Sequence, residues 1–259
     1  MVRVEGAVAV VTGGASGIGA ALARRLAVEG ASAVVVADVD ADGAAALAAA
    51  LPGGTGRPLV FDVGDEEQVA SAVATVEDQV GPVDVWCSNA GVAPGPGLGG
   101  DDDWQRCWRL HVHAHVLAAR HVLPRMLARG RGHLMITASA AGLLTEADSA
   151  PYAVTKHGSV AIAEWLAIRY GDRGVTFSCL CPQGVRTPML AGLPADAATL
   201  AAGRVISPEE VAEAVIEAWR QERFLILPHP EVAEYERRRA ADRDRWLAGM
   251  RRFLARRRG

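Results

Sequence analysis

Short apolar segments alternate with segments of helical periodicity along most of the chain, and this alternation limits the possible folds more than any other feature. Strands that alternate with long helices form βαβ units, in which a parallel sheet is covered by helices on both faces. We expect strands near residues 7–11, 33–37, 59–61, 83–88, 133–138, 175–180 and 224–227, and helices near 17–29, 42–51, 66–80, 103–129, 150–170 and 208–221.

The alternation continues without an obvious linker, repeat or low-complexity segment. A length of 259 residues suits one large α/β domain better than two. We therefore expect a single domain over residues 1–259, which ends in a basic tail over residues 234–259.

A glycine-rich turn, Thr12-Gly-Gly-Ala-Ser-Gly-Ile-Gly19, follows the first expected strand and opens the first expected helix. Glycines allow a tight turn and a close approach of a ligand to the backbone, and the helix N-terminus presents free N–H groups to a pyrophosphate. Such a turn also serves ordinary strand-to-helix corners, but here it has the required context. The candidate cofactor-binding residues of this turn are Gly13, Ser16, Gly17, Ile18 and Gly19.

Asp38 closes the second expected strand, about 20 residues beyond the turn, where an acidic side chain binds the ribose hydroxyls of NAD. Its charge would repel the extra phosphate of NADP, and no arginine directly follows it, so NADP is the less favoured cofactor. A helix-cap role is the alternative for Asp38. Other strand ends supply further candidate cofactor contacts, namely Asp62, Val63, Asn89, Ala90 and Gly91.

Lys156 is the only lysine of the chain, and it follows Tyr152 by four residues. Residues at this spacing share one face of a helix, so the ammonium can lie beside the phenol. A neighbouring positive charge favours the phenolate, which in water forms near pH ~10, and makes the tyrosine a general base. The pattern is short, and a packed tyrosine beside a surface lysine is the alternative for this pair alone.

These motifs together make the chain resemble the short-chain dehydrogenase/reductase family over residues 7–190, about three quarters of its length. The resemblance implies a Rossmann-type, doubly wound parallel sheet, a nicotinamide cofactor and alcohol/carbonyl redox chemistry. It also implies a homo-oligomer, a tetramer or a dimer, built from the helices at 103–129 and 150–170. The motifs that carry it are the glycine turn, Asp62, Asn89-Ala90-Gly91, Ser139, Tyr152, Lys156, and Pro182-x-x-Val185-x-Thr187.

Under this resemblance Tyr152 exchanges the hydroxyl proton, Ser139 holds the substrate oxygen, and Lys156 lowers the pKa of the tyrosine and binds the nicotinamide ribose. The resemblance also assigns to the cofactor site Pro182, Gly184, Val185 and Thr187. The loop at 187–207 carries methionine and leucine side chains, so we expect an apolar secondary alcohol or ketone as substrate. Arg186 is the one candidate anchor for an acidic substrate, and a surface arginine is the alternative.

The chain departs from the family pattern at His111 and Gln183. The family usually has asparagine at the first position, where it supports a proton relay from the catalytic lysine to solvent. We count His111 among the candidate catalytic residues because an imidazole can pass a proton near neutral pH, although it could also only pack there. Zinc binding by His111 and His115 is disfavoured, since no third ligand accompanies them. No metal is expected.

The overall composition excludes several classes of protein. The net charge of −3 does not indicate a nucleic-acid partner, and no segment is long and apolar enough to span a membrane. The four cysteines lack the spacing of a disulfide framework, so we expect a cytoplasmic protein with reduced thiols. The tail at 234–259 holds ten arginines and four acidic residues, typical of a solvated, partly frayed helix. A docking role is the alternative for this tail.

Two other functions are compatible with such a chain. One is a regulatory protein that binds NAD and has lost catalysis, which the intact Ser139, Tyr152 and Lys156 argue against. The other is an epimerase or dehydratase on a related scaffold, but such enzymes are usually longer. The sequence therefore favours an NAD-dependent oxidoreductase.

Overall fold

A computed structural model describes residues 2–194, 197–201 and 203–257. Positions 195–196 and 202 of the expected substrate loop, and 258–259 of the basic tail, lie outside the described residues. Within the described part of the chain, seven strands form one sheet with the order β3-β2-β1-β4-β5-β6-β7. The strands are β1 (Val8–Thr12), β2 (Ala33–Asp38), β3 (Gly56–Val60), β4 (Val83–Ser88), β5 (Gly132–Thr137), β6 (Val175–Leu180) and β7 (Leu225–Ile226).

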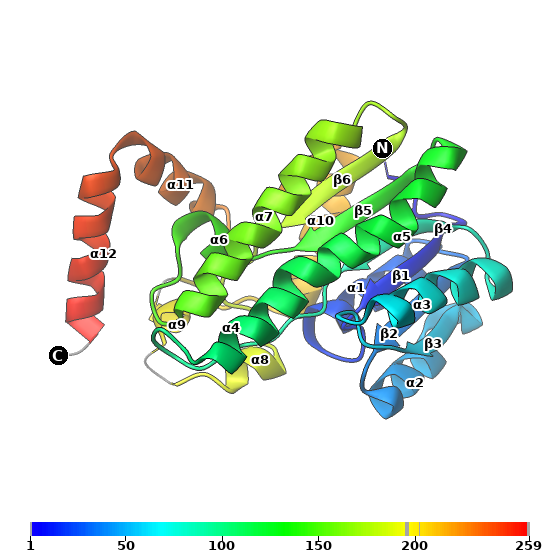
Figure 1. The fold of residues 1–259 in the computed structure, drawn as a ribbon, viewed down its shortest axis with the longest axis horizontal. Coiled ribbons are helices and arrows are strands. Elements are labelled where there is room, and N and C mark those ends of the chain that lie inside the picture. Colours follow the sequence, from blue (N-terminus) through cyan, green and yellow to red (C-terminus); the bar gives the residue numbers. More distant parts are fainter. Residues whose placement is uncertain (1, 195–196, 202, 258–259) are drawn as a thin grey trace.

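Every pair of neighbouring strands runs parallel, as expected from the alternation in the sequence. The chain returns to the centre of the sheet after β3, so that β1 and β4 lie side by side (Figure 1). This is the doubly wound, Rossmann-like arrangement, in which ligands bind where the strand order reverses.

Helices cover both faces of the sheet because successive strand residues point to opposite sides. Ala9 and Val11 pack with α1, α2 and α10, whereas Val8 and Val10 pack with α3, α5 and α7. Both clusters consist almost wholly of small aliphatic residues, as the composition indicates. The helices are α1 (Gly17–Val28), α2 (Ala41–Ala50), α3 (Glu66–Gln79), α5 (Ala114–Arg129), α6 (Ala141–Leu144), α7 (Ala150–Tyr170), α8 (Pro188–Ala191), α9 (Ala198–Ala201) and α10 (Pro208–Arg220).

The third strand begins earlier than the apolar pattern predicts, at Gly56 instead of residue 59. β3 is an edge strand, and its first residues are largely exposed, so they carry no apolar signal. Pro58 is tolerated there because an edge strand does not use all of its N–H groups.

The long helix expected at 103–129 is interrupted by a wider turn. It begins with α4 (Asp101–Trp108), passes through a π-helical segment at Arg109–His113 and continues as α5. Such π-turns inside α-helices are frequent at functional sites. This one contains His111, which it directs into the protein interior.

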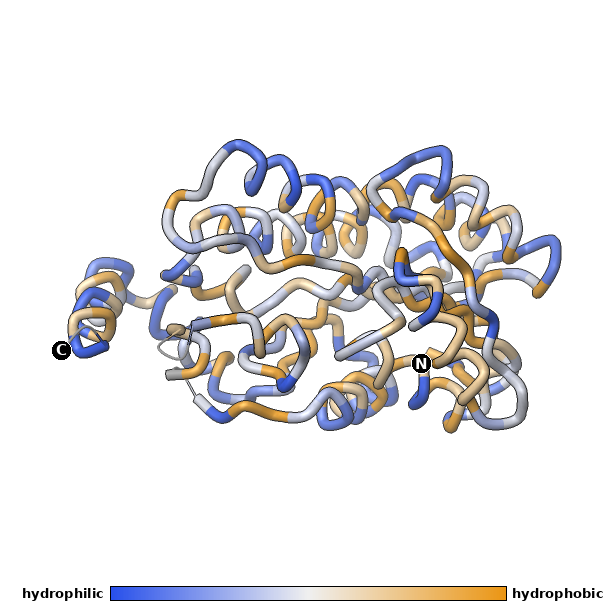
Figure 2. Tube along the Cα trace, turned by 90° about the horizontal axis from the view of Figure 1, so that it is seen from below, coloured by the Kyte–Doolittle hydropathy of each residue, from blue (hydrophilic) through white to orange (hydrophobic). Residues whose placement is uncertain are grey.

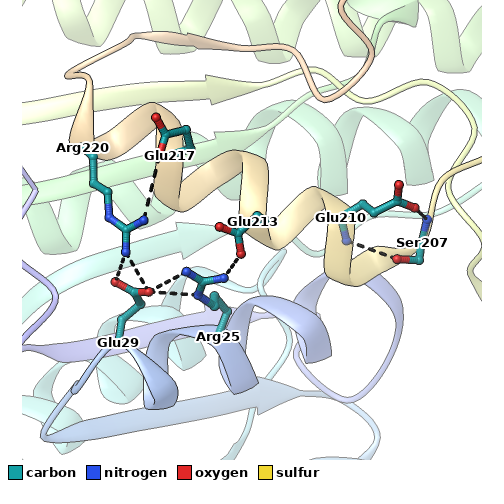
Figure 3. A network of polar contacts seen from close by, with 7 residues as sticks. All are labelled: Arg25, Glu29, Ser207, Glu210, Glu213, Glu217 and Arg220. Carbon is teal, nitrogen blue, oxygen red and sulfur yellow. Dashed lines mark hydrogen bonds and ion pairs between the residues drawn. The ribbon is translucent and has the colours of Figure 1, made fainter.

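Ion pairs fasten α1 to α10 on one face of the sheet (Figure 3). Arg25 pairs with Glu29 of its own helix at 2.6 Å and with Glu213 of α10, while Arg220 reaches Glu29 at 2.9 Å. The exposed fraction of these side chains is large enough that each pair stabilises the fold by only ~0.2–1 kcal/mol.

The amino end of α10 is fixed by a capping box, also drawn in Figure 3. The Ser207 side chain accepts from the Glu210 N–H at 3.1 Å, and the Glu210 carboxylate accepts from the Ser207 N–H at 2.8 Å. Pro208 occupies the first turn, where its missing N–H does no harm. The capping box therefore fixes the end of the substrate loop at Ser207.

The basic tail folds as two helices, α11 (Glu231–Ala241) and α12 (Arg243–Arg257), instead of one frayed helix. Asp242 between them has an extended backbone and breaks the helical hydrogen bonding. Figures 1 and 2 both show α12 standing at one side of the domain, joined to it through α11. No helix in the described residues is long and apolar enough to cross a membrane.

Candidate active site

A cavity of about 1490 Å³ opens at the carboxyl ends of the strands. Its walls come from the segments that follow β1, β2, β4, β5 and β6, together with α11 and α12. Of the candidate cofactor residues, those that line it are Gly13, Ser16, Gly17, Ile18, Gly19, Asp38, Asp62, Val63, Asn89, Ala90, Gly91, Tyr152, Lys156, Pro182, Val185 and Thr187.

Gly184 is the exception among these residues. A side chain at Gly184 would meet Val205 at 3.3 Å and Thr199 at 3.6 Å, not the cavity. Its carbonyl accepts from the Ile206 N–H at 3.1 Å. Gly184 therefore joins the two ends of the substrate loop and does not line the cavity, and its assignment as a cofactor contact stays a prediction.

The glycine turn fits a dinucleotide because its backbone is tightly packed and exposed to the cavity. Gly13 has φ +63°, and a Cβ atom there would lie 2.8 Å from Ala90 Cα. Gly17 has φ +52° and is the first residue of α1, so the free N–H groups of that helix face the same cavity. Backbone N–H groups and a helix N-terminus together suit a pyrophosphate.

Asp38 lies beside this turn at the end of β2. Its carboxylate accepts from the Ala15 N–H at 3.0 Å and from the Asp40 N–H at 3.1 Å. The helix cap that follows is Asp40, whose side chain accepts from the Gly43 N–H at 3.0 Å. Asp38 is thus half-buried on the cavity wall, and the cap role belongs to Asp40.

The other polar strand ends are fixed by hydrogen bonds across the sheet edge. The Asn89 side chain donates to the Thr12 carbonyl at 3.0 Å, and this bond holds the carboxyl ends of β4 and β1 together. Asp62 accepts from the Gly64 N–H at 2.8 Å and pairs with Arg109 at 2.9 Å. Arg109 also lines the cavity and carried no signal in the sequence.

Ser139, Tyr152 and Lys156 meet on one wall of the cavity. Ser139 follows β5, and its hydroxyl accepts from the Ala141 N–H at 3.1 Å. Tyr152 and Lys156 lie one turn apart on α7, and the Lys156 Nζ atom is 5.8 Å from the centre of the phenol ring. The same ammonium donates to the Thr137 carbonyl at 3.0 Å, so its position is fixed by the sheet.

The pKa values in this cluster are governed by burial. Burial raises the pKa of Tyr152 to about 12, and a hydrogen bond with Ser139 acts in the opposite direction. Burial lowers the pKa of Lys156 to about 8. Burial therefore opposes the expected lowering of the tyrosine pKa by Lys156, because removal from water favours the neutral phenol.

His111 lies behind Tyr152, with the two rings 5.5 Å apart and nearly perpendicular. Its Nε2 atom accepts from the Val92 N–H at 3.1 Å, which leaves Nδ1 as the donor to the Thr155 hydroxyl at 2.9 Å. Burial lowers the pKa of His111 well below its usual value, and the charge of Lys156 adds to this. Burial therefore favours the neutral imidazole at this position and opposes the protonated form that a proton relay would use.

His115 does not form a metal site with His111. Its Nδ1 atom is 2.7 Å from the Ser88 hydroxyl, and burial lowers its pKa to about 3. Among the described residues, no group of three His, Cys, Asp or Glu side chains is placed to hold a metal ion.

The substrate side of the cavity combines residues that the sequence singled out with others that it did not. Gln183, where the chain departs from the family pattern, lines it, and its backbone N–H donates to His229 Nδ1 at 3.1 Å. Glu146 is also on the wall, and burial raises its pKa. Arg186 is exposed and does not line the cavity. The apolar wall combines the expected Met189, Leu190 and Leu193 with Tyr235, Trp246, Met250 and Phe253 of the tail.

Comparisons with known proteins agree with this geometry. The family whose model matches residues 7–198 is described as short chain dehydrogenase. The chain is 39% identical over 233 residues to 1-deoxy-11-beta-hydroxypentalenate dehydrogenase of Streptomyces exfoliatus, covering 86% of this chain and 83% of that protein. It is 40% identical over 216 residues to cis-4-hydroxycyclohexanecarboxylate dehydrogenase of Sinomonas cyclohexanicum, covering 80% and 87%.

Among solved structures, a short chain dehydrogenase/reductase from Burkholderia phymatum in complex with NAD superimposes with a TM-score of 0.85. The two sequences are 28% identical, and the match covers 94% of this chain and 96% of that one.

Proposed function

The chain belongs to the short-chain dehydrogenase/reductase family, and from this premise we propose that it transfers a hydride between NAD and a secondary alcohol or ketone. The observation that carries the proposal is the meeting of Ser139, Tyr152 and Lys156 on the cavity that the glycine turn opens into. A nicotinamide bound along this wall would supply the hydride chemistry, and the protein supplies position and proton transfer.

Each catalytic side chain has a role that follows from its surroundings. Tyr152 removes the hydroxyl proton of an alcohol, or donates a proton to the oxygen of a ketone. Ser139 holds that oxygen by a hydrogen bond. Lys156 holds the cofactor ribose and supplies positive charge beside the phenol, with its ammonium fixed by the Thr137 carbonyl. His111 acts as a neutral positioning residue that supports the Tyr152 ring and the Val92 backbone.

NAD is the preferred cofactor in this proposal. Asp38 offers its carboxylate on the cavity wall beside the turn, where it suits ribose hydroxyls and repels a phosphate. Further support comes from the Burkholderia phymatum structure, whose bound ligand is NAD.

The substrate is an apolar secondary alcohol or ketone, because aliphatic and aromatic side chains dominate the far walls of the cavity. The names of two relatives support the alcohol chemistry, since both describe dehydrogenases of hydroxylated carboxylates.

Assembly and location complete the proposal. Trp108, Trp165 and Ile168 on α4 and α7 remain between 53% and 86% exposed, an apolar surface suited to pairing with a second copy. The four free, buried cysteines suit a reducing, cytoplasmic compartment. We therefore propose a cytoplasmic homo-oligomer, either a dimer or a tetramer.

The experiment is a panel of secondary alcohols and ketones assayed with NAD(H) and NADP(H), following reduced cofactor by absorbance. The proposal expects turnover with NAD(H) and weaker use of NADP(H). Tight NAD binding without turnover of any compound would favour the alternative, a catalytically silent NAD-binding protein.

A further inference from the structure

One face of α12 is directed toward the cavity. Trp246, Met250, Phe253 and Arg257 all line it, and their spacing places them on a single stripe of the helix. Leu247 lies about a quarter of a turn away from this stripe and is 47% exposed. The half-buried stripe therefore faces a specific space, whereas the outer side of α12 faces solvent.

An ion pair docks this helix on the domain. Arg257 donates to both carboxylate oxygens of Asp148, with N–O distances of 3.0 and 3.1 Å. Such two-point pairs fix the relative orientation of both partners. The Arg257 side chain is only 15% exposed, so this pair is better shielded than the other ion pairs of the tail, whose arginines exceed 60% exposure.

Asp148 also connects α12 to the other substrate-side walls. Its side chain accepts from the Ala198 N–H of α9 at 2.5 Å, and its carbonyl accepts from the Gly97 N–H at 2.6 Å. Its own N–H donates to Glu146 at 2.6 Å. Asp148 therefore holds α12, the substrate loop and the loop after β4 together. It lies four positions before Tyr152 in the chain.

The cavity is larger than one ligand requires. Pockets for a single small molecule measure about 300–1,000 Å³, whereas this one measures about 1490 Å³. It has room for a dinucleotide and for a second ligand that extends away from Ser139 and Tyr152. Apolar side chains form much of the wall in that direction, from Leu144 and Leu193 to the aromatic side chains of the tail, with Arg238 and Arg257 beside them.

Tyr235 of α11 and Trp246 of α12 reinforce this wall. Their rings lie 6.4 Å apart at an interplanar angle of 43°, so the two helices present one continuous aromatic surface. An apolar surface of this kind next to a redox site suits the hydrocarbon body of a substrate, since burying it removes apolar area from water.

We propose that the inner face of α12, docked by Arg257 on Asp148, is a specificity wall that selects secondary alcohols or ketones with a bulky apolar body. The proposal rests on the proposed function and names the substrate class of that same site. Phe253 and Met250 contact the end of the substrate farthest from the reacting carbon, so they act on selection and leave the chemistry to Ser139, Tyr152 and Lys156.

The test compares two probes, decahydro-2-naphthol and cyclohexanol, which differ by one fused ring. We expect the wild type to favour the larger alcohol in kcat/KM by about tenfold or more. Phe253→Ala should reduce this preference about tenfold through KM, and Arg257→Met should do the same by undocking the wall. The matched control, Leu247→Ala, removes a solvent-exposed aliphatic side chain of the same helix that does not line the cavity, and it should leave the preference unchanged.

The outcomes separate the two proposals. If the wild type oxidises neither probe, nor any alcohol of the panel, the proposed function fails. If it oxidises both equally well, or if Phe253→Ala leaves the preference intact, the specificity wall is overturned. Sedimentation of Phe253→Ala tests whether a second copy of the chain, instead of the substrate, covers the inner face of α12. A smaller assembly with an unchanged substrate preference would assign the face to a second copy of the chain.

Discussion

The two sides of the cavity are built in different ways. The cofactor side consists of strand ends and the glycine turn, where backbone atoms and short hydrogen bonds such as that from Ala15 to Asp38 fix each position. The substrate side consists of loops and of α11 and α12, and the ion pair between Arg257 and Asp148 docks α12. We infer that the chemistry depends on the strand ends and the glycine turn, whereas the choice of substrate depends on the loops and on α12.

The largest expected effect concerns Tyr152, where the two sides meet. Tyr152→Phe removes the acid/base hydroxyl and keeps the ring, so turnover should fall by about 10²-fold or more while NAD binding changes little. Steady-state rates and NAD titrations measure both quantities. Tyr170→Phe is the control, since Tyr170 lies outside the cavity wall and packs on Trp165. Near-normal turnover in correctly folded Tyr152→Phe would contradict the role of Tyr152 as the acid/base group.

A second test lowers the pH, which should destabilise the folded sheet region through its buried histidines. Burial lowers the pKa values of His115 and His133 to about 3, from an ordinary value of 6.5. The unfolded chain therefore binds these protons first, and stability should fall as the pH drops below 6.5, by up to ~1.4 kcal/mol per pH unit for each residue. Chemical unfolding at pH 7 and 5.5 measures the loss.

The same pH change should leave the docking of α12 in place. Burial tends to raise the pKa of Asp148, but its bonds to Arg257 and Ala198 outweigh this and hold it below 3.8. The pair therefore stays ionised above that pH. A probe preference that collapses between pH 7 and 5.5, while the protein remains folded, would contradict the assignment of Asp148 as the docking group.

A smaller effect is expected at Asp38, which should alter cofactor choice and nothing on the substrate side. Asp38→Asn keeps an oxygen for the Ala15 N–H and removes the charge, so the preference for NAD over NADP should narrow about tenfold. Titration of both cofactors measures the ratio. Asp40→Asn removes a nearby charge that does not line the cavity and is the matched control. An unchanged ratio in Asp38→Asn would assign cofactor choice to other residues.

Sequence reasoning anticipated the cofactor side well because its signals are local. The glycine turn and the Tyr152–Lys156 spacing each lie within a few residues, and their elements were expected within a few residues of their observed bounds. Gly184 does not line the cavity, because a glycine after a strand can serve a loop contact as readily as a ligand.

The substrate side was anticipated less well because its contacts join distant segments. Asp148 and Arg257 are 109 residues apart, and nothing in either segment indicates the other. The sequence of α12 resembles that of a solvated helix, because six of its fifteen residues are arginines. His111 was placed near the catalytic cluster, but its burial could not be read from sequence, and burial sets its pKa.

The most direct test of the central claim follows the hydrogen itself. Cyclohexanol that carries deuterium on its carbinol carbon is incubated with the wild-type protein and NAD, and the reduced cofactor is weighed by mass spectrometry. Hydride transfer predicts one deuterium in each reduced cofactor, formed much more slowly by Tyr152→Phe. Reduced cofactor without deuterium would contradict hydride transfer from the alcohol carbon to NAD.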